Sequence, residues 1–248
     1  MINVHVIPIL EDNYCFLVEN TADQSAVIID PGESAGVIAA LEQRQLKPVA
    51  IWNTHHHSDH IDGNAGILER YGPLLVVGSD GDRGRIAQLN HFVHPGDTLE
   101  FGGENVKVLG VPGHTISHIA FYFPSGHLFS GDLLFGYSCG AVFEGTMEQM
   151  YHSVSQLLEM PDSTQVYCGH EYTLNNRKWA QHVDPDNIDV QQRIGLETDP
   201  PTVPLQLGVE KRTNHFLRCT DPKIQAFTGK SDPAEVFAAL RIQKNSFK

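Results

Sequence analysis

The feature that most restricts how this chain can fold is a histidine-rich heptapeptide, THHHSDH, at residues 54–60. It directly follows an apolar run, residues 49–53, which predicts a strand. His55 and His57 are two residues apart, so on an extended segment both side chains point to the same side. Two imidazoles on one side can bind one ion, and imidazole suits zinc, iron or manganese.

The last two positions of the heptapeptide, Asp59 and His60, come where the chain is expected to enter a helix over residues 61–70. They can serve a second ion beside the first. A competing interpretation is a histidine-rich loop in which Ser58 or Asp59 caps that helix. The regular spacing directly after a strand favours the metal site.

Three further polar residues stand where predicted strands end. His114 lies in the sequence PGHT, Asp132 in SGD and His170 in CGH. Taken singly, Asp132 could be a turn residue and the two histidines could be ordinary loop residues. Taken together they favour a functional site, because α/β sheets place their sites at the ends of strands.

Composition narrows the class of protein. The chain has 248 residues, 14 histidines and a formal net charge of −13, which argues against binding to a phosphate backbone. The four cysteines are scattered and none pair at CxxC spacing, which argues against a zinc ribbon. No long apolar run and no basic segment before an apolar one are present, so we expect a cytoplasmic protein that does not bind membranes.

The chain is expected to have two parts. Alternating apolar runs and a few helices predict an α/β domain over residues 1–170, and a polar, sparsely apolar texture predicts a helical domain over residues 171–248. Thr146 and Gln149 have the spacing of a capping box, and Asp232 followed by Pro233 predicts the start of a final helix. Strands are expected at residues 4–9, 15–19, 26–29, 49–53, 74–77, 98–101, 106–111, 119–123, 127–129 and 166–168, and a helix at 35–44.

The motifs THHHSDH, PGHT, SGD and CGHEYT, in this order, resemble the metallo-β-lactamase superfamily, and within it glyoxalase II, the hydroxyacylglutathione hydrolases. The resemblance implies an αββα sandwich with a small C-terminal helical domain. It also implies two divalent metal ions, of which zinc is the first expectation and iron or manganese the others. By this resemblance one metal is held by His55, His57 and His114, the other by Asp59, His60 and His170, and Asp132 bridges the two.

The same resemblance implies a glutathione site. Tyr172 matches a glutathione-binding tyrosine, and Phe143 stands where the family has Phe or Tyr. Arg241 and Lys244 match a basic pair that holds the glycine carboxylate of glutathione. The competing interpretation is that this pair complements the C-terminal end of a helix.

One position departs from the family pattern. Ala141 stands where many members carry Lys or Arg, so one cationic contact to the substrate is missing. We therefore expect weaker binding of glutathione thioesters, or a somewhat different substrate. The metal ligands are unaffected by this change.

The implied activity is hydrolysis of S-(2-hydroxyacyl)glutathione, of the lactoylglutathione type, by a metal-bound hydroxide that Asp59 contacts. A monomer with a small-molecule substrate is expected. Alternatives are a persulfide dioxygenase with one iron, a phosphodiesterase of the same fold, a non-catalytic metal-binding module and a β-lactamase proper. The tail residues Tyr172, Arg241 and Lys244 favour the thioesterase, although fold alone does not fix function.

Overall fold

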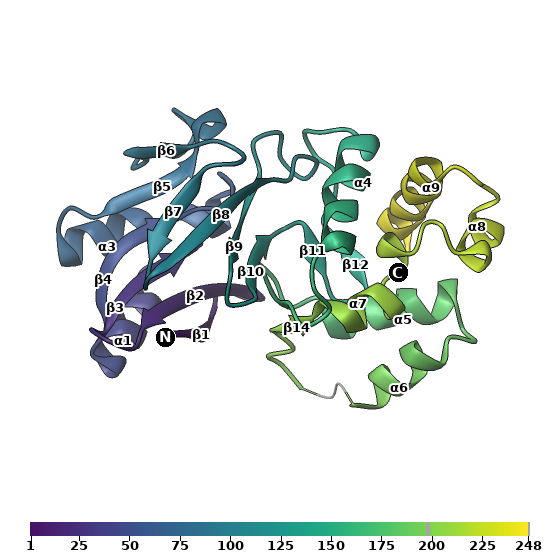
Figure 1. The fold of residues 1–248 in the computed structure, drawn as a ribbon, viewed down its shortest axis with the longest axis horizontal. Coiled ribbons are helices and arrows are strands. Elements are labelled where there is room, and N and C mark those ends of the chain that lie inside the picture. The colour runs from purple at the N-terminus through teal and green to yellow at the C-terminus, as the bar shows by residue number, and fades with distance from the viewer. Residues whose placement is uncertain (197–198, 248) are drawn as a thin grey trace. The chain divides into compact units, whose positions relative to one another are not determined.

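A computed structural model describes residues 1–196 and 199–247. Residues 197, 198 and 248, which belong to the predicted helical domain, lie outside the described residues. The chain forms two compact units, one of residues 1–110 and 117–131 and one of residues 111–116 and 132–248 (Figure 1). The domain boundary expected at residue 170 stays a prediction.

The first unit is built on a six-stranded sheet with the order β1-β2-β3-β4-β5-β6. The first three strands pair antiparallel, and the last four are parallel. Parallel neighbours need crossover connections, and helices provide two of them. The elements are β1 (Ile2–Ile9), β2 (Asn13–Asn20), β3 (Ser25–Ile29), α1 (Ala35–Arg44), β4 (Lys47–Trp52), α2 (Ser58–Ile61), α3 (Asn64–Tyr71), β5 (Leu75–Ser79), a 3₁₀ turn (Asp80–Asp82) and β6 (His91–Val93).

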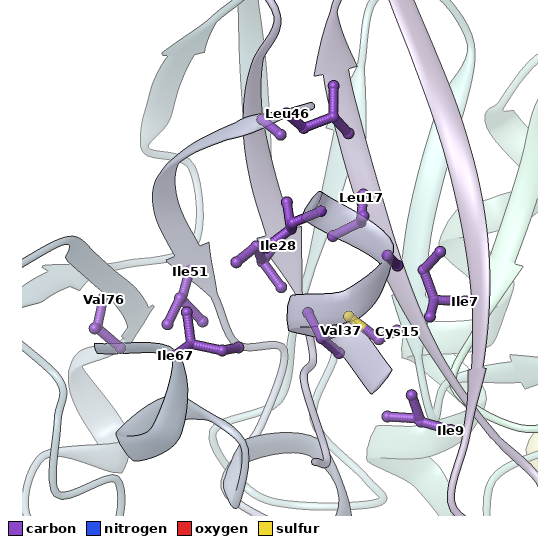
Figure 2. Close-up of a cluster of buried hydrophobic side chains, with 13 residues drawn as sticks. Ile7, Ile9, Cys15, Leu17, Ile28, Val37, Leu46, Ile51, Ile67 and Val76 are labelled. Carbon is purple, nitrogen blue, oxygen red and sulfur yellow. The ribbon is translucent and has the colours of Figure 1, made fainter. Parts of the chain in front are cut away.

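The helices α1 and α3 pack on one face of this sheet, against alternate side chains of its strands. Cys15 and Leu17 of β2 and Ile28 of β3 belong to one buried cluster with Val37 of α1 and Ile67 of α3. Figure 2 shows the helix residues of this cluster reaching toward the strand residues. Because successive side chains of a strand point to opposite faces, the residues between them are left for the other side of the sheet.

A second sheet of the same unit packs against that other side. Four strands of this sheet, all in the first unit, form an antiparallel meander with the order β10-β9-β8-β7. Trp52 of β4 contacts Phe121, with ring centroids 5.0 Å apart, and Phe16 of β2 contacts Phe129 at 5.5 Å. Aromatic rings therefore fill the space between the sheets. The strands are β7 (Thr98–Phe101), β8 (Glu104–Gly110), β9 (Ile119–Phe123) and β10 (His127–Gly131).

The second unit is mostly helical. The predicted capping box is present, because the Thr146 hydroxyl accepts from the backbone of Gln149 and the Gln149 side chain accepts from the backbone of Thr146. Asp232 caps the last helix as predicted. The elements are β11 (Leu134–Phe135), β12 (Ser138–Cys139), α4 (Met147–Ser155), β13 (Gln165–Cys168), α5 (Thr173–Val183), α6 (Ile188–Leu196), β14 (Leu205–Gln206), α7 (Leu207–Thr213), α8 (Pro222–Thr228) and α9 (Pro233–Ser246), with 3₁₀ turns at Gln156–Glu159 and His215–Leu217.

The expected helix over residues 61–70 is wrong as a single element. The chain instead makes the short helix α2, breaks at Gly63 and continues as α3. A Cβ at Gly63 would lie 2.5 Å from the carbonyl oxygen of Glu33, and the Gly63 amide donates to the carbonyl of Pro31. This close backbone approach interrupts the helix. Six further elements, β6, β11, β12, β14, α7 and α8, are not among those predicted from the sequence.

Two expectations about the whole chain can be compared with the structure. All four cysteines, which are scattered along the sequence, are free and buried. Within residues 1–196 and 199–247, none of the helices is long and apolar enough to cross a membrane.

The packing of the first sheet against its helices predicts the cost of a core truncation. Ile28→Ala removes a fully buried side chain and should lower the free energy of unfolding by about 2–5 kcal/mol. Chemical denaturation measures this. The matched control is Val49→Ala, whose side chain is 43% exposed and should change stability little. Equal effects of the two substitutions would contradict the assignment of Ile28 to the core.

Candidate metal centre and substrate cavity

The heptapeptide begins directly after β4, and its histidines lie close together. The Nε2 atom of His55 is 3.1 Å from the Nδ1 atom of His57. The ring of His60 lies 4.2 Å from the ring of His55, measured between centroids. Two ring nitrogens that face each other can share a proton, or both can direct lone pairs at one cation.

A buried carboxylate fixes this arrangement. Asp30 lies at the end of β3, and its two oxygens accept from the backbone amide of Thr54 at 2.7 Å and from the Thr54 hydroxyl at 2.6 Å. The Nδ1 atom of His60 lies 3.2 Å from the same carboxylate. A histidine whose Nδ1 faces a carboxylate presents Nε2 as the ligand atom. Asp30 thereby orients a predicted ligand without being one.

Asp59 is held from the other side. The side-chain amide of Asn13 donates to the Asp59 carboxylate at 2.8 Å and lies 3.3 Å from the Asp59 carbonyl. A Cβ at Gly32 would fall 2.0 Å from that carbonyl oxygen, so only glycine permits this approach. The Asp59 carboxylate ends 3.6 Å from Nε2 of His60.

A second group of predicted ligands lies within the second unit. The Nε2 atoms of His114 and His170 lie 3.3 and 3.4 Å from the same carboxylate oxygen of Asp132. His114 donates from Nδ1 to the carbonyl of Ala141 at 2.8 Å, which leaves its Nε2 as the ligand atom. An oxygen flanked by two imidazole nitrogens fits the role of a bridging carboxylate.

Two further histidines lie close to the proposed ligands. The Nδ1 atom of His56 lies 3.1 Å from Asp82, and its Nε2 contacts Arg85, so this side chain has partners other than the predicted ligands. The buried ring of His118 stacks on that of His55 at 4.7 Å with an interplanar angle of 17°. His118 thus supports a predicted ligand by packing.

The donor atoms suit divalent metals. Histidine and aspartate side chains of the chain form groups that could hold a metal ion. Both groups described above combine imidazole nitrogens with a carboxylate and have a carboxylate or carbonyl behind a ligand, which is the usual construction of such sites. The residues therefore fit the metals that the sequence implies.

A cavity of about 290 Å³ lies within the second unit. It brings together three of the four predicted substrate residues, Tyr172, Arg241 and Lys244, together with Ala141. The ring of Tyr172 stacks on the ring of His170 at 4.8 Å with an interplanar angle of 6°, so the cavity wall touches a predicted metal ligand. The other lining residues are Phe135, Ser138, Cys139, Asn175 and Asn176.

The fourth predicted substrate residue, Phe143, lies elsewhere. Its side chain is 68% exposed, and its ring lies 5.1 Å from the ring of His114. It therefore borders a predicted metal ligand and does not line the cavity.

The cavity carries positive charge. Arg241 is buried and donates from Nη1 to the carbonyl of Cys139 at 2.7 Å and from Nε to Asn245 at 3.0 Å. Burial, and then the nearby Arg241, lower the pKa of the Lys244 ammonium. Among the described residues no carboxylate pairs with either cation. In a chain of net charge −13, two unneutralised cations in one cavity favour an anionic ligand.

The comparisons with known proteins agree with this geometry. Residues 9–170 match the metallo-beta-lactamase superfamily, and residues 171–247 match the C-terminal part of hydroxyacylglutathione hydrolase. A protein named hydroxyacylglutathione hydrolase from a Synechococcus species is 49% identical over 247 residues, which are 97% of this chain and 98% of that protein. The chain belongs to the hydroxyacylglutathione hydrolase family. The predicted fold class, a metallo-β-lactamase α/β fold with a C-terminal helical domain, is confirmed.

Solved structures with the metallo-β-lactamase fold are also similar. The similarity to ETHE1 from Myxococcus xanthus extends over 100% of this chain and 92% of that protein. The two share 24% sequence identity with a TM-score of 0.69, which shows the fold alone. The protein TTHA1623, solved in a di-iron-bound form, covers 87% of this chain and 100% of its own at 28% identity with a TM-score of 0.61.

Two residues that contact the predicted ligands of this hydroxyacylglutathione hydrolase family member, Asp30 and Asn13, could not be found from the motifs. The sequence motifs predict no role for Asp30 or Asn13. A usable signal existed for Asp30, because it is another aspartate at a strand end, as Asp132 is. Asn13 carries no such signal, since its contact with Asp59 spans 46 residues.

Asp30→Asn tests the orienting role. Asn keeps the shape and tolerates the positive φ of 51° at this position, but it offers one acceptor atom fewer. Metal affinity should fall by about 10- to 100-fold, as is usual when an outer partner of a ligand is lost. Metal content after chelator competition measures this, with Asp23→Asn on the surface as control. Undiminished affinity in a folded Asp30→Asn protein would refute the role.

Proposed function

We propose that this chain hydrolyses S-(2-hydroxyacyl)glutathione thioesters, of the lactoylglutathione type, to glutathione and a 2-hydroxy acid. One observation carries the proposal. The cationic cavity and the predicted ligand His170 meet at Tyr172, which lines the cavity and stacks on the His170 ring. A ligand anchored in this cavity would thus lie beside a group that can hold metal. The near full-length similarity to proteins named hydroxyacylglutathione hydrolase supports the same substrate.

The metal ligands are proposed residue by residue. His55, His57 and His114 would hold one ion, Asp59, His60 and His170 the other, and Asp132 would bridge them. When bound, two divalent ions lower the pKa of a coordinated water and polarise a carbonyl. We further propose zinc as the metal, and a cytoplasmic monomer as the working form.

The protein's own residues supply orientation. Asp30 and the carbonyl of Ala141 fix the rings of His60 and His114, so each presents Nε2. Asn13 donates to the Asp59 carboxylate and so orients the side chain of this proposed catalytic residue.

The departing group explains why a dedicated proton donor is not required. A thiol has a pKa of about 8.5, so glutathione can leave as a thiolate near neutral pH. Arg241 and Lys244 hold positive charge in the same unit, which suits the carboxylates of the tripeptide.

The one-iron persulfide dioxygenase and the phosphodiesterase remain the alternatives. Both would use metal ligands of the same kind, so the cavity is what separates them from the thioesterase. Oxygen uptake with glutathione persulfide, or cleavage of a phosphodiester, would favour them over the proposal.

The first prediction from the proposed function concerns the reaction and its dependence on metal. Purified protein of measured metal content should cleave S-D-lactoylglutathione, followed by loss of the thioester and release of thiol. Asp132→Ala should lower the amount of metal bound per chain, because it removes the proposed bridging ligand. As a result, kcat should fall by several orders of magnitude. Asp186→Ala on the exposed surface is the control. A fully active, metal-free Asp132→Ala protein would exclude the metal mechanism.

The second prediction concerns the cavity. Lys244→Met removes a half-buried charge and keeps the volume, so KM for lactoylglutathione should rise about 10- to 100-fold with kcat nearly unchanged. Lys244 is a cleaner probe than Arg241, whose guanidinium also bonds the carbonyl of Cys139. Lys178→Met, on the exposed face of α5, is the control. An unaltered KM in Lys244→Met would disprove a glutathione site here.

A further inference from the structure

A tight hairpin forms part of the cavity wall. It consists of β11 and β12 with the connecting residues Gly136 and Tyr137. Phe135, Ser138 and Cys139 of this hairpin line the cavity. Tyr137 has a φ of +60°, a left-handed conformation that is rare for a bulky residue and must be maintained by its surroundings. We call residues 135–139 the wall turn.

Two buried side chains bind the backbone of the wall turn. Asn214 donates from Nδ2 to the carbonyl of Phe135 at 3.1 Å and to the carbonyl of Ser138 at 2.9 Å. A carboxylate oxygen of Glu210 accepts from the amide of Tyr137 at 3.1 Å. Both Asn214 and Glu210 are fully buried. Their bonds reach the turn from 73 to 79 residues further along the chain.

Further buried groups complete the set. The side-chain amide of Asn176 donates to the carbonyl of Gly136 at 3.1 Å, and Arg241 donates to the carbonyl of Cys139. The backbone of the wall turn is therefore bonded to side chains at each of its five residues. The side chains that make these hydrogen bonds come from α5, from α7, from the residue that follows α7 and from α9.

A charge pair lies behind the turn. Nη2 of Arg193 lies 2.6 Å from Glu210, whose other oxygen also accepts from Asn214 at 3.0 Å. The Arg193 guanidinium lies 3.8 Å above the centre of the Tyr137 ring. A buried ion pair is weak support for stability compared with apolar residues of similar size, so its use here points to another purpose.

We propose that Glu210 and Asn214 are positioning residues, which keep the wall turn in the one shape that lets the cavity bind the thioester. Glu210 and Asn214 contact the wall turn, whereas the residues that line the cavity contact the substrate. This inference rests on the proposed function, since the cavity is taken to bind glutathione thioester. The residues belong to neither the proposed metal ligands nor the proposed substrate contacts, so their loss acts on KM through the shape of the wall.

Asn214→Asp is the first test variant. It keeps the size and the oxygen that caps Phe216, but it places an acceptor opposite the carbonyls of Phe135 and Ser138 and the carboxylate of Glu210. With S-D-lactoylglutathione, KM should rise about tenfold or more while kcat stays within about threefold. Metal content per chain should equal that of the wild type.

Glu210→Ala and Glu210→Gln form the second test. Gln keeps an acceptor for the Tyr137 amide, so its KM should lie between the wild type and Glu210→Ala. Glu210→Gln, which preserves volume, decides the question if Asn214→Asp does not fold. An unchanged KM in the folded variants overturns the proposal, and so does a loss of activity that follows metal loss.

Ile224→Ala is the matched control for general destabilisation. Ile224 is fully buried in α8 and has no bond to the wall turn. It should lower the melting temperature and leave KM unchanged. If Ile224→Ala raises KM as much as Asn214→Asp at equal loss of stability, the effect is structural and the proposal fails.

Amide hydrogen exchange of the segment 134–140 separates this inference from the proposed function. Exchange should be faster in Asn214→Asp and Glu210→Ala than in the wild type and in Ile224→Ala, whatever the substrate. Wild-type protein that cleaves no thioester would refute the proposed function, while exchange would still show whether the two residues hold the turn. Wild-type exchange rates in both variants would refute the positioning role even in an active enzyme.

Discussion

The arrangement of the histidines in the first unit depends on the buried carboxylate of Asp30. It accepts two hydrogen bonds from Thr54 and faces Nδ1 of His60, so it joins the end of β3 to the segment that follows β4. A buried carboxylate is costly unless its hydrogen bonds are made, and here each of its two oxygens has a donor. The contact between Asp30 and Nδ1 of His60 also directs Nε2, the proposed ligand nitrogen of His60. The hydrogen bonds that the buried Asp30 needs for a stable fold therefore include the one that orients the proposed ligand His60.

The second unit applies the same principle with backbone carbonyls. The carbonyl of Ala141 fixes His114, and two residues earlier the carbonyl of Cys139 receives Arg241. One short segment thus orients a proposed metal ligand and a proposed substrate-binding cation. The bond from Arg241 holds the Cys139 end of this segment, and the bond from His114 holds the Ala141 end.

Much of the fold could be predicted because the signals are local, and the proposed ligands stand in motifs of only a few residues. The strand before the heptapeptide, the helix at Ala35–Arg44 and the capping box of Thr146 depend on spacing within a few residues. Asn13, Glu210 and Asn214 could not be predicted, since their roles arise from contacts across 46 to 79 residues. The break of the expected helix at Gly63 has the same cause. It follows from a close approach to Glu33 and Pro31, which helical periodicity does not report.

Ala141 illustrates how the proposed substrate cavity can change while the contacts of a proposed metal ligand are kept. Its side chain lines the cavity, whereas its carbonyl accepts from His114. A backbone carbonyl is present whatever the side chain, so replacing a basic residue by alanine removes a cation from the cavity and keeps the bond to the ligand. Positive charge in the cavity then depends on Arg241 and Lys244. The wall turn contributes the Cys139 carbonyl that accepts from Arg241. The position of the Arg241 charge therefore depends on the conformation of the wall turn.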